Sequence, residues 1–492
     1  MNRPRSESVE AALAQRLAEA APHLGADIID NAHGPVDTRD PANSPDPVDA
    51  PDPANAADAV NAQGVDRDAA ALLDIVARVI CTRPTPDRLW LALAAIAGCL
   101  PHADDVNEAR YRAETSNPAQ MAMWMLDYAL ERGSPETDTR ALRVAHDTVL
   151  VDPGISGEER TLKPFDALVA SIISRWATRR DVLCVSWTPG SECWTVAASG
   201  AMEIVVPWHT TVVAFGRLAP GACERIAGAA EFSGSQFAAL VDDCFPAASA
   251  FLRADATVRS VATYLGVLRR FGRLVALSKA SASDLRGFTS ALPAQGLDGP
   301  QVAFCNLPTT TLSLPSPVPE TPAVAKLSPS NATPTVLCVG NPDDQSDQSV
   351  LISACERLRR EGLRFELTFA GTEVPNIDSL YASSRFTVFP SIHEGNSLAI
   401  SQCLARRVPV VCSKFLDFAP ACGIASVDTS DDASLADVMR TLLVDDDAVD
   451  DLLTQIDRRR EISYGDFAED LWGLLVGGHG PSEDSTWSGR GA

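Results

Sequence analysis

The residues most suggestive of chemistry lie in a short polar loop between an apolar run and a helical run. Residues 386–389 are apolar or β-branched and predict a buried strand, which ends at Pro390. Residues 398–406 have helical spacing, and the small residues 395–397 stand just before that helix. Such a loop presents free N–H groups and the positive end of a helix dipole, which suits a diphosphate. Every doubly wound domain offers such a loop somewhere, so on geometry alone a structural turn is the competing interpretation.

The elements around this loop predict an open α/β sheet. Residues 408–413 are a second buried run, which completes a strand–loop–helix–strand unit. The same alternation occurs over residues 335–370, and again over 147–311, where the apolar run 236–241 ends at Asp242. Because open α/β sheets bind ligands at the carboxyl ends of their strands, Asp242 is a candidate ligand-facing group.

The remaining residues predict flanking regions. Residues 1–67 are rich in Pro, Ala and Asp and predict a disordered acidic tail, with room for one short helix near residues 8–21. Residues 68–146 have helical periodicity and predict a helical extension, with core positions at Met121, Met123, Trp124 and Met125. The domains that follow are predicted at 147–311 and 335–476, joined by a Pro-rich linker at 312–334 and followed by a flexible tail at 477–492.

Composition narrows the class of protein. The chain has 492 residues, enough for two or three domains, and its 46% hydrophobic content is typical of globular cores. A net charge of −24 argues against nucleic acid or an anionic membrane surface as a general partner. The 12 cysteines form no CxxC pair, and neither a signal peptide nor a membrane span is predicted, so we expect a cytoplasmic protein.

The loop and its flanks resemble the nucleotide-sugar motif of the retaining GT-B glycosyltransferases of the bacterial group-1 (family 4) type, approximately F-P-S-x-x-E-G-x-G-L-P-x-x-E. The sequence matches this motif at Phe389, Pro390, Ser391, Glu394, Gly395 and Leu398. It departs from it at Ser397, Ala399 and Gln402, where the family has Gly, Pro and a second Glu. The resemblance covers about residues 149–476 and implies two Rossmann-like lobes facing a cleft.

The resemblance also implies roles for individual residues. The resemblance implies that Glu394 and the backbone amides of Gly395, Asn396 and Ser397 contact the donor sugar and phosphates. It also places Gly340, Asn341 and Leu398 at the donor site. It gives Gln402 to the ribose, which a neutral amide would hold more weakly than a carboxylate, since charged hydrogen bonds are roughly twice as strong. It puts Asp242 in the acceptor lobe, as the counterpart of Glu394 in catalysis.

Two cations expected by the resemblance are replaced. Relatives carry G-R-x-x-x-x-K after the first donor strand, whereas Asn341 and Ser346 stand here in an acidic loop. Loss of one preorganised group typically costs on the order of 10²–10³ in rate. Three interpretations stay open: a solvated loop of a degenerate enzyme, cations supplied from elsewhere, or a divalent metal held by the loop's aspartates, ranked last because this family is normally metal-independent. The candidate cations are Arg273, Lys279, Lys326 and Lys414.

The expected activity is therefore transfer of a hexose from a nucleotide sugar to a glycan or lipid-linked saccharide acceptor, with retention of configuration and with no metal or other cofactor. The alternative is an inactive pseudo-glycosyltransferase that acts as a binding or scaffold protein in glycan assembly. His209 and His393 are interpreted as a strand-end and a loop histidine rather than as bases. The sequence contains no P-loop, GxGxxG, HExxH or GxSxG motif.

Overall fold

The computed structural model divides the chain into two compact units, each described here by itself. Unit 1 comprises Met1–His146, Thr188–His209 and Glu224–Ser235, and unit 2 comprises Asp147–Trp187, Thr210–Cys223 and Gln236–Ala492. The structure describes residues 3–25, 69–133, 139–154, 164–188, 190, 192–198, 201–241, 255–310, 333–339, 348–370, 377–390, 398–414 and 423–477.

Unit 1 combines a helical bundle with a small sheet. Its helices and strands are α1 (Arg3–Leu24), α4 (Ala69–Thr82), α5 (Pro86–Ala97), α6 (Ala103–Thr115), α7 (Pro118–Arg132), β1 (Leu142–Ala145), β5 (Cys193–Ala198), β6 (Ala201–Pro207) and most of α9 (Cys223–Phe232). Strand β6 pairs with β1 in parallel and with β5 in antiparallel register.

The first helix lies in the expected tail 1–67, and at Arg3–Leu24 it is longer than the short helix near residues 8–21 for which that expectation left room. Helix α1 packs against α4, α5 and β1, and its Leu17 and Leu24 are fully buried. Its buried Arg16 donates hydrogen bonds to the carbonyls of Ala95 and Ile96 at the end of α5 and to that of Arg140. The end of a helix leaves carbonyls without partners, and a guanidinium satisfies several of them at once. Residues 26–67 of the expected tail lie outside the described residues.

The expected helical extension also gains residues from later in the chain. The β5–β6 hairpin and most of α9, predicted as parts of the domain 147–311, belong to unit 1. Arg225 of α9 explains the attachment of that helix, because its buried guanidinium donates to the carbonyl of Leu100 and pairs with Glu192. The prediction of a core position is confirmed for Met121 and Met125 and is wrong for Met123, which is 68% exposed.

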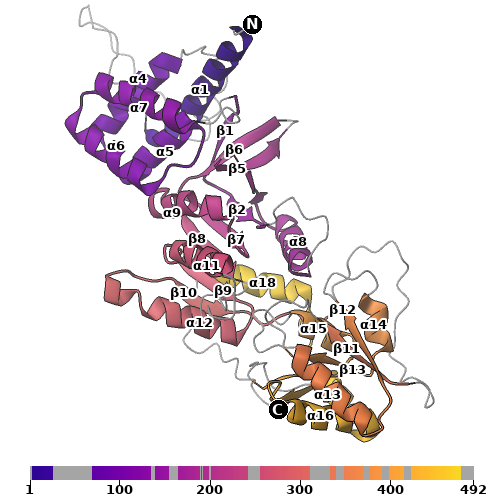
Figure 1. Ribbon diagram of the computed structural model, residues 1–492. Helices are drawn as coiled ribbons and strands as arrows, with labels where there is room; N and C mark the ends of the chain where they lie inside the picture. The colour runs from indigo at the N-terminus through magenta and orange to yellow at the C-terminus, as the bar shows by residue number, and fades with distance from the viewer. Residues whose placement is uncertain are drawn as a thin grey trace, which may run out of the picture. The chain divides into compact units, whose positions relative to one another are not determined.

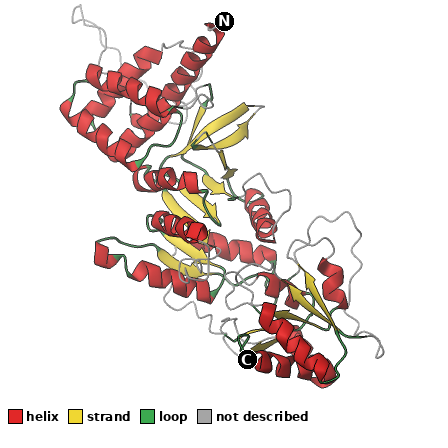
Figure 2. Ribbon diagram, viewed as in Figure 1, coloured by secondary structure: helices red, strands yellow, loops and turns green. Residues whose placement is uncertain are grey.

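Unit 2 contains two parallel sheets. The first has six strands in the order β10-β9-β8-β7-β2-β3, and the second has five in the order β12-β11-β13-β14-β15. Helices alternate with strands along both, as Figure 2 shows. We call the first sheet with its helices the first lobe and the second sheet with its helices the second lobe. Two lobes of this Rossmann-like kind are the GT-B fold class that the sequence predicted.

The elements of unit 2 alternate between strands and helices along the chain. The first lobe consists of β2 (Val149–Asp152), α8 (Pro164–Ala177), β3 (Val182–Cys184), β7 (Thr211–Phe215), β8 (Gln236–Val241), α11 (Asp255–Leu268), β9 (Arg273–Ala276), α12 (Lys279–Ser290) and β10 (Gln301–Phe304). The short strand β4 (Ser186–Thr188) belongs instead to the small sheet, in the order β1-β6-β5-β4. The second lobe consists of β11 (Thr335–Val339), α13 (Gln348–Arg360), β12 (Glu366–Ala370), α14 (Ile377–Ser383), β13 (Phe386–Phe389), α15 (Leu398–Ala405), β14 (Val410–Ser413), β15 (Ile424–Val427), α16 (Asp432–Val444) and α17 (Asp446–Asp457).

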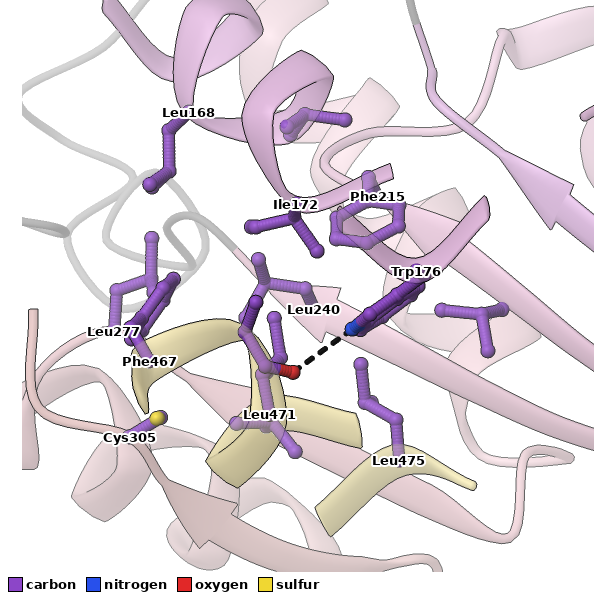
Figure 3. Packing of buried hydrophobic residues seen from close by; sticks show 14 of the residues in the cluster. Leu168, Ile172, Trp176, Phe215, Leu240, Leu277, Cys305, Phe467, Leu471 and Leu475 are labelled. Atoms are coloured by element: carbon purple, nitrogen blue, oxygen red, sulfur yellow. Dashed lines mark hydrogen bonds between the residues drawn. The ribbon is translucent and has the colours of Figure 1, made fainter. Parts of the chain in front are cut away.

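The last helix, α18 (Tyr464–Leu475), completes the core of the first lobe rather than that of the second. Its Phe467 and Leu471 are fully buried among residues of α8, β7, β8 and β9 (Figure 3). Trp176 of α8 donates its indole N–H to the carbonyl of Ala468 over 2.8 Å, the dashed line in Figure 3. Glu469 on the same helix pairs with Arg180. In Figure 1, α18 lies beside β9 of the first lobe.

Candidate functional site

The expected donor loops start from the two strands that flank the switch point of the second sheet. The chain leaves β11 for β12 on one side and returns to β13 on the other side of β11. Cys338 pairs with Val388 in parallel register, so β11 and β13 end side by side. Open α/β sheets bind ligands at this place, outside the carboxyl ends of the strands where the strand order reverses.

Most residues assigned to the donor lie in the loops that follow these two strands. The loops are residues 340–347 after β11 and 391–397 after β13, both outside the described residues. The residues concerned are Gly340, Asn341, Glu394, Gly395, Asn396 and Ser397, and their roles stay predictions. The cleft expected between the lobes also stays a prediction.

Helix α15 begins directly after the second loop, and it is described from Leu398 onward. Ile400 and Leu404 pack into the core of the second sheet, as the helical spacing predicted. Leu398 instead belongs to the core of the first lobe, together with residues of α8 and α18. Ser401 donates its hydroxyl to the carbonyl of Pro308, which follows β10, over 2.7 Å. The helix nearest the expected donor therefore contacts both lobes.

Gln402, at the position of the family's second glutamate, is held at both ends of its amide. Its Nε2 donates to the hydroxyl of Tyr464 over 3.0 Å, and its Oε1 accepts from Nη1 of Arg406 over 2.7 Å. Arg406 in turn pairs with Asp378, and its guanidinium lies 5.4 Å from the ring centroid of Tyr381. Burial raises the pKa of the Tyr464 phenol, while its contact with Gln402 acts in the opposite direction.

The cations that could replace the missing arginine and lysine differ in which edge of their sheet they occupy. Arg273 is the first residue of β9, at the edge of the sheet opposite the carboxyl ends, and it donates to the carbonyls of Leu475 and Gly477. Lys279 begins α12, at the carboxyl side of β9, with its Nζ 5.9 Å from the ring centroid of Phe304.

Lys414 follows β14 at the carboxyl edge of the second sheet. It pairs with Asp428 over 2.9 Å. Hydrogen bonds from Ser430 and then from Lys414 lower the pKa of Asp428 to about 2, so this partner is ionised at neutral pH. Lys326 lies outside the described residues. Lys279 and Lys414 are therefore the candidates placed at ligand-binding edges.

The first lobe has its own switch point, between β2 and β7. Asp152 ends β2 there; it is only 5% exposed and accepts the N–H of Gly154 over 3.0 Å. A Cβ on Gly154 would lie 2.1 Å from the carbonyl oxygen of Phe215, so the turns after β2 and β7 meet closely. Asp242 follows the next strand, β8, and lies outside the described residues.

Sequence reasoning overlooked Asp152 as a candidate. The signal that selected Asp242, a carboxylate at the end of an apolar run, was present for Asp152 too. Strand order, which no local pattern gives, is what puts the end of β2, and with it Asp152, at the switch point.

The histidines and possible metal ligands add no catalytic group among the described residues. His209 lies in unit 1, where its Nε2 is 3.1 Å from Asp87 and its backbone N–H donates to the carbonyl of Ser233. His393 lies outside the described residues. Within the described ranges, no group of three or more His, Cys, Asp or Glu side chains is placed to hold a metal ion. No helix in the described part of the chain is both long and apolar enough to cross a membrane.

Comparison with known proteins agrees with the geometry of the second lobe. Residues 322–445 match the family model "Glycosyl transferases group 1". No match was found among curated proteins. Among solved structures, the chain is similar to a sucrose-phosphate synthase from Thermosynechococcus elongatus (13% identity, 67% of this chain and 98% of that one, TM-score 0.46).

Two further solved structures are similar at the same level. They are HepE from Anabaena in complex with UDP and glucose (13% identity, 67% and 99% of the two chains, TM-score 0.45) and the catalytic domain of starch synthase IV from Arabidopsis thaliana bound to ADP and acarbose (10% identity, 67% and 99%, TM-score 0.46). Similarities this low indicate nothing about a substrate. The family match over residues 322–445 and the two parallel-sheet lobes together support a glycosyltransferase of the GT-B type.

Proposed function

We propose that the protein transfers a hexose from a nucleotide sugar to a glycan or lipid-linked saccharide acceptor, with retention at the anomeric carbon. In this proposal the second lobe holds the donor and the first lobe presents the acceptor. The observation that carries it is the switch point between β11 and β13, because both loops that the family resemblance assigns to the donor follow these two strands. These loops also lie within the residues that match the group 1 family model.

The chemistry of such a transfer requires stabilisation of a leaving nucleoside diphosphate. Negative charge develops on the bridging oxygen as the bond to the sugar breaks, and preorganised N–H donors stabilise it most effectively. The start of α15, with the loop 391–397 before it, would supply those donors. Glu394 would orient the donor sugar, Gln402 would contact the ribose, and Asp242 would act on the acceptor side. Asp152, buried at the first switch point, is a second acceptor-side candidate.

A second candidate function, a nucleotide-sugar-binding or scaffold protein without catalysis, has a specific observation in its favour. Of the candidate cations in the described residues, Arg273 is engaged by backbone carbonyls and Lys414 by Asp428. The acidic loop after β11, with Asn341 and Ser346 in place of two cations, points in the same direction.

Calorimetric titration with UDP-, GDP- and ADP-sugars, followed by an assay for release of nucleoside diphosphate, separates the two functions. A transferase binds at least one donor below millimolar concentration and turns it over. Glu394→Ala should lower turnover at least about tenfold, the loss of one good charged contact, whereas Glu356→Ala, on the exposed side of α13, should not. Binding without turnover would favour the scaffold, and no binding below millimolar would contradict the proposed donor site.

A further inference from the structure

Side chains at the start of helix α15, next to the expected donor loop, contact the first lobe. Leu398, its first residue, is buried in the core that α8 and α18 form with the first sheet. Ser401 and Gln402 then donate hydrogen bonds to Pro308 and to Tyr464. Tyr464 begins α18, whose apolar face is buried in the first lobe. The bond between Gln402 and Tyr464 therefore joins a donor-lobe helix to a helix embedded in the other lobe.

The hydrogen bonds that the Gln402 amide forms with Arg406 and with Tyr464 are unequal. Its Oε1 accepts from the charged guanidinium of Arg406 over 2.7 Å, within the second lobe. Its Nε2 donates to the neutral hydroxyl of Tyr464 over the longer distance of 3.0 Å. Charge-assisted hydrogen bonds are roughly twice as strong as neutral ones. A ligand oxygen that takes the place of the Tyr464 hydroxyl at Nε2 would therefore cost Gln402 the weaker of these two bonds and leave the bond to Arg406.

From this arrangement we infer that the donor's ribose and Tyr464 compete for Gln402, so that donor binding releases a hydrogen bond between the lobes. The inference rests on the proposed function, because it takes a ribose hydroxyl as the competitor. Such a competition makes binding and the lobe contact thermodynamically linked: whatever weakens the Gln402–Tyr464 bond in the free protein strengthens donor binding by the same factor. Tyr464 then opposes binding through Gln402 and is a positioning residue rather than a donor contact.

The linkage predicts a gain of affinity from the loss of a hydroxyl. Tyr464→Phe keeps the ring and its packing but removes the acceptor for Nε2 of Gln402. The net contribution of one neutral hydrogen bond corresponds to about a two- to tenfold change in affinity, so this variant should bind the nucleotide about two- to tenfold more tightly. If the Tyr464 hydroxyl instead held Gln402 in the orientation that the ribose requires, Tyr464→Phe would weaken nucleotide binding, because the amide would lose that orientation.

Calorimetric titration of the full-length protein with UDP, GDP and ADP tests the inference. Tyr464→Phe should tighten binding of whichever nucleotide the wild type binds, while Gln402→Ala should weaken it. Adding Tyr464→Phe to Gln402→Ala should then change nothing, because Tyr464 acts only through Gln402. Tyr381→Phe is the matched control, since this buried tyrosine on α14 of the second lobe contacts Cys403 rather than Gln402. Circular dichroism melts confirm that each variant is folded.

The outcomes separate this inference from the proposed function. If the wild type binds a nucleotide but Tyr464→Phe binds it equally or more weakly, competition for Gln402 is overturned while the donor site stands. The same holds if Tyr464→Phe tightens binding as strongly on the Gln402→Ala background as alone. If the wild type binds none of the three nucleotides, the donor site and the competition are both overturned.

Discussion

Shortening Leu471 on α18 should destabilise the first lobe, although this helix follows the second lobe in the chain. Leu471 is fully buried in the cluster that contains Trp176 and Phe467 (Figure 3). A buried Leu→Ala change costs about 3–5 kcal/mol, because the lost transfer free energy is joined by the cost of the cavity left behind. The same change at Leu474, which is only partly buried on the same helix, should cost about 1 kcal/mol.

Native-state hydrogen exchange measured by mass spectrometry assigns this loss to a lobe. A destabilisation of about 3 kcal/mol raises the opening equilibrium roughly 100-fold, since each 1.4 kcal/mol is a factor of ten. Amides of β8 and β9 in the Leu471→Ala variant should therefore exchange about 100-fold faster, while those of β13 and β14 change little. Equal acceleration in both lobes, or an effect of Leu471→Ala no larger than that of Leu474→Ala, would refute the assignment of α18 to the first core.

Three further changes test other contacts. A hydrogen bond from Arg180 lowers the pKa of Glu469 below its ordinary 4.5. The ionised carboxylate therefore stabilises the folded protein fully above pH 4.5, and this stabilisation is lost as the pH falls through the lowered pKa. The difference in melting temperature between wild type and Glu469→Gln should vanish at pH values below that lowered pKa. Arg16→Met leaves buried carbonyls unsatisfied and should cost about 2–4 kcal/mol in urea unfolding, against about 0.5 kcal/mol or less for Arg78→Met, which loses one exposed i,i+4 pair. Gly154→Ala forces a Cβ onto a carbonyl at positive φ and should cost at least about 2 kcal/mol, whereas Gly287→Ala, in open space on a helix, should stabilise by about 0.5–1 kcal/mol.

Local patterns were sufficient to predict the second lobe. The apolar runs of β11, β13 and β14 are each four or five residues long and are almost wholly buried, so burial on both faces of a parallel sheet is visible in the sequence itself. The helix after β13 was likewise predicted from its spacing, and Ile400 and Leu404 face the sheet accordingly. Because both faces of these strands are buried, nearly every residue in each run is apolar, and for that reason a local pattern describes them well.

Contacts between distant segments could not be predicted in the same way. Arg16 looks like a surface residue of an isolated helix, yet its partners are carbonyls about 80 and 120 residues later in the chain. Met123 lies on a helical run and was expected in the core, but the buried side of α7 passes through Met121 and Met125 instead. The helix after β9 begins at Lys279, where Ser278 accepts the N–H of Ser281 and caps it.

The charge balance of the chain explains why a phosphate ligand would depend on backbone N–H groups. With 65 acidic and 41 basic residues, carboxylates outnumber the cations available to them. In the second lobe, Arg385, Arg406, Arg407 and Arg440 each pair with at least one carboxylate. Lys414 stands at the carboxyl edge of the sheet, and its partner Asp428 is ionised and therefore competes directly with any phosphate for the same ammonium. Backbone N–H groups at the start of a helix form no ion pairs, so neighbouring carboxylates do not remove their partial positive charge. An acidic lobe that binds a diphosphate must therefore bind it chiefly through its backbone, which is the role that the loop before α15 is proposed to have.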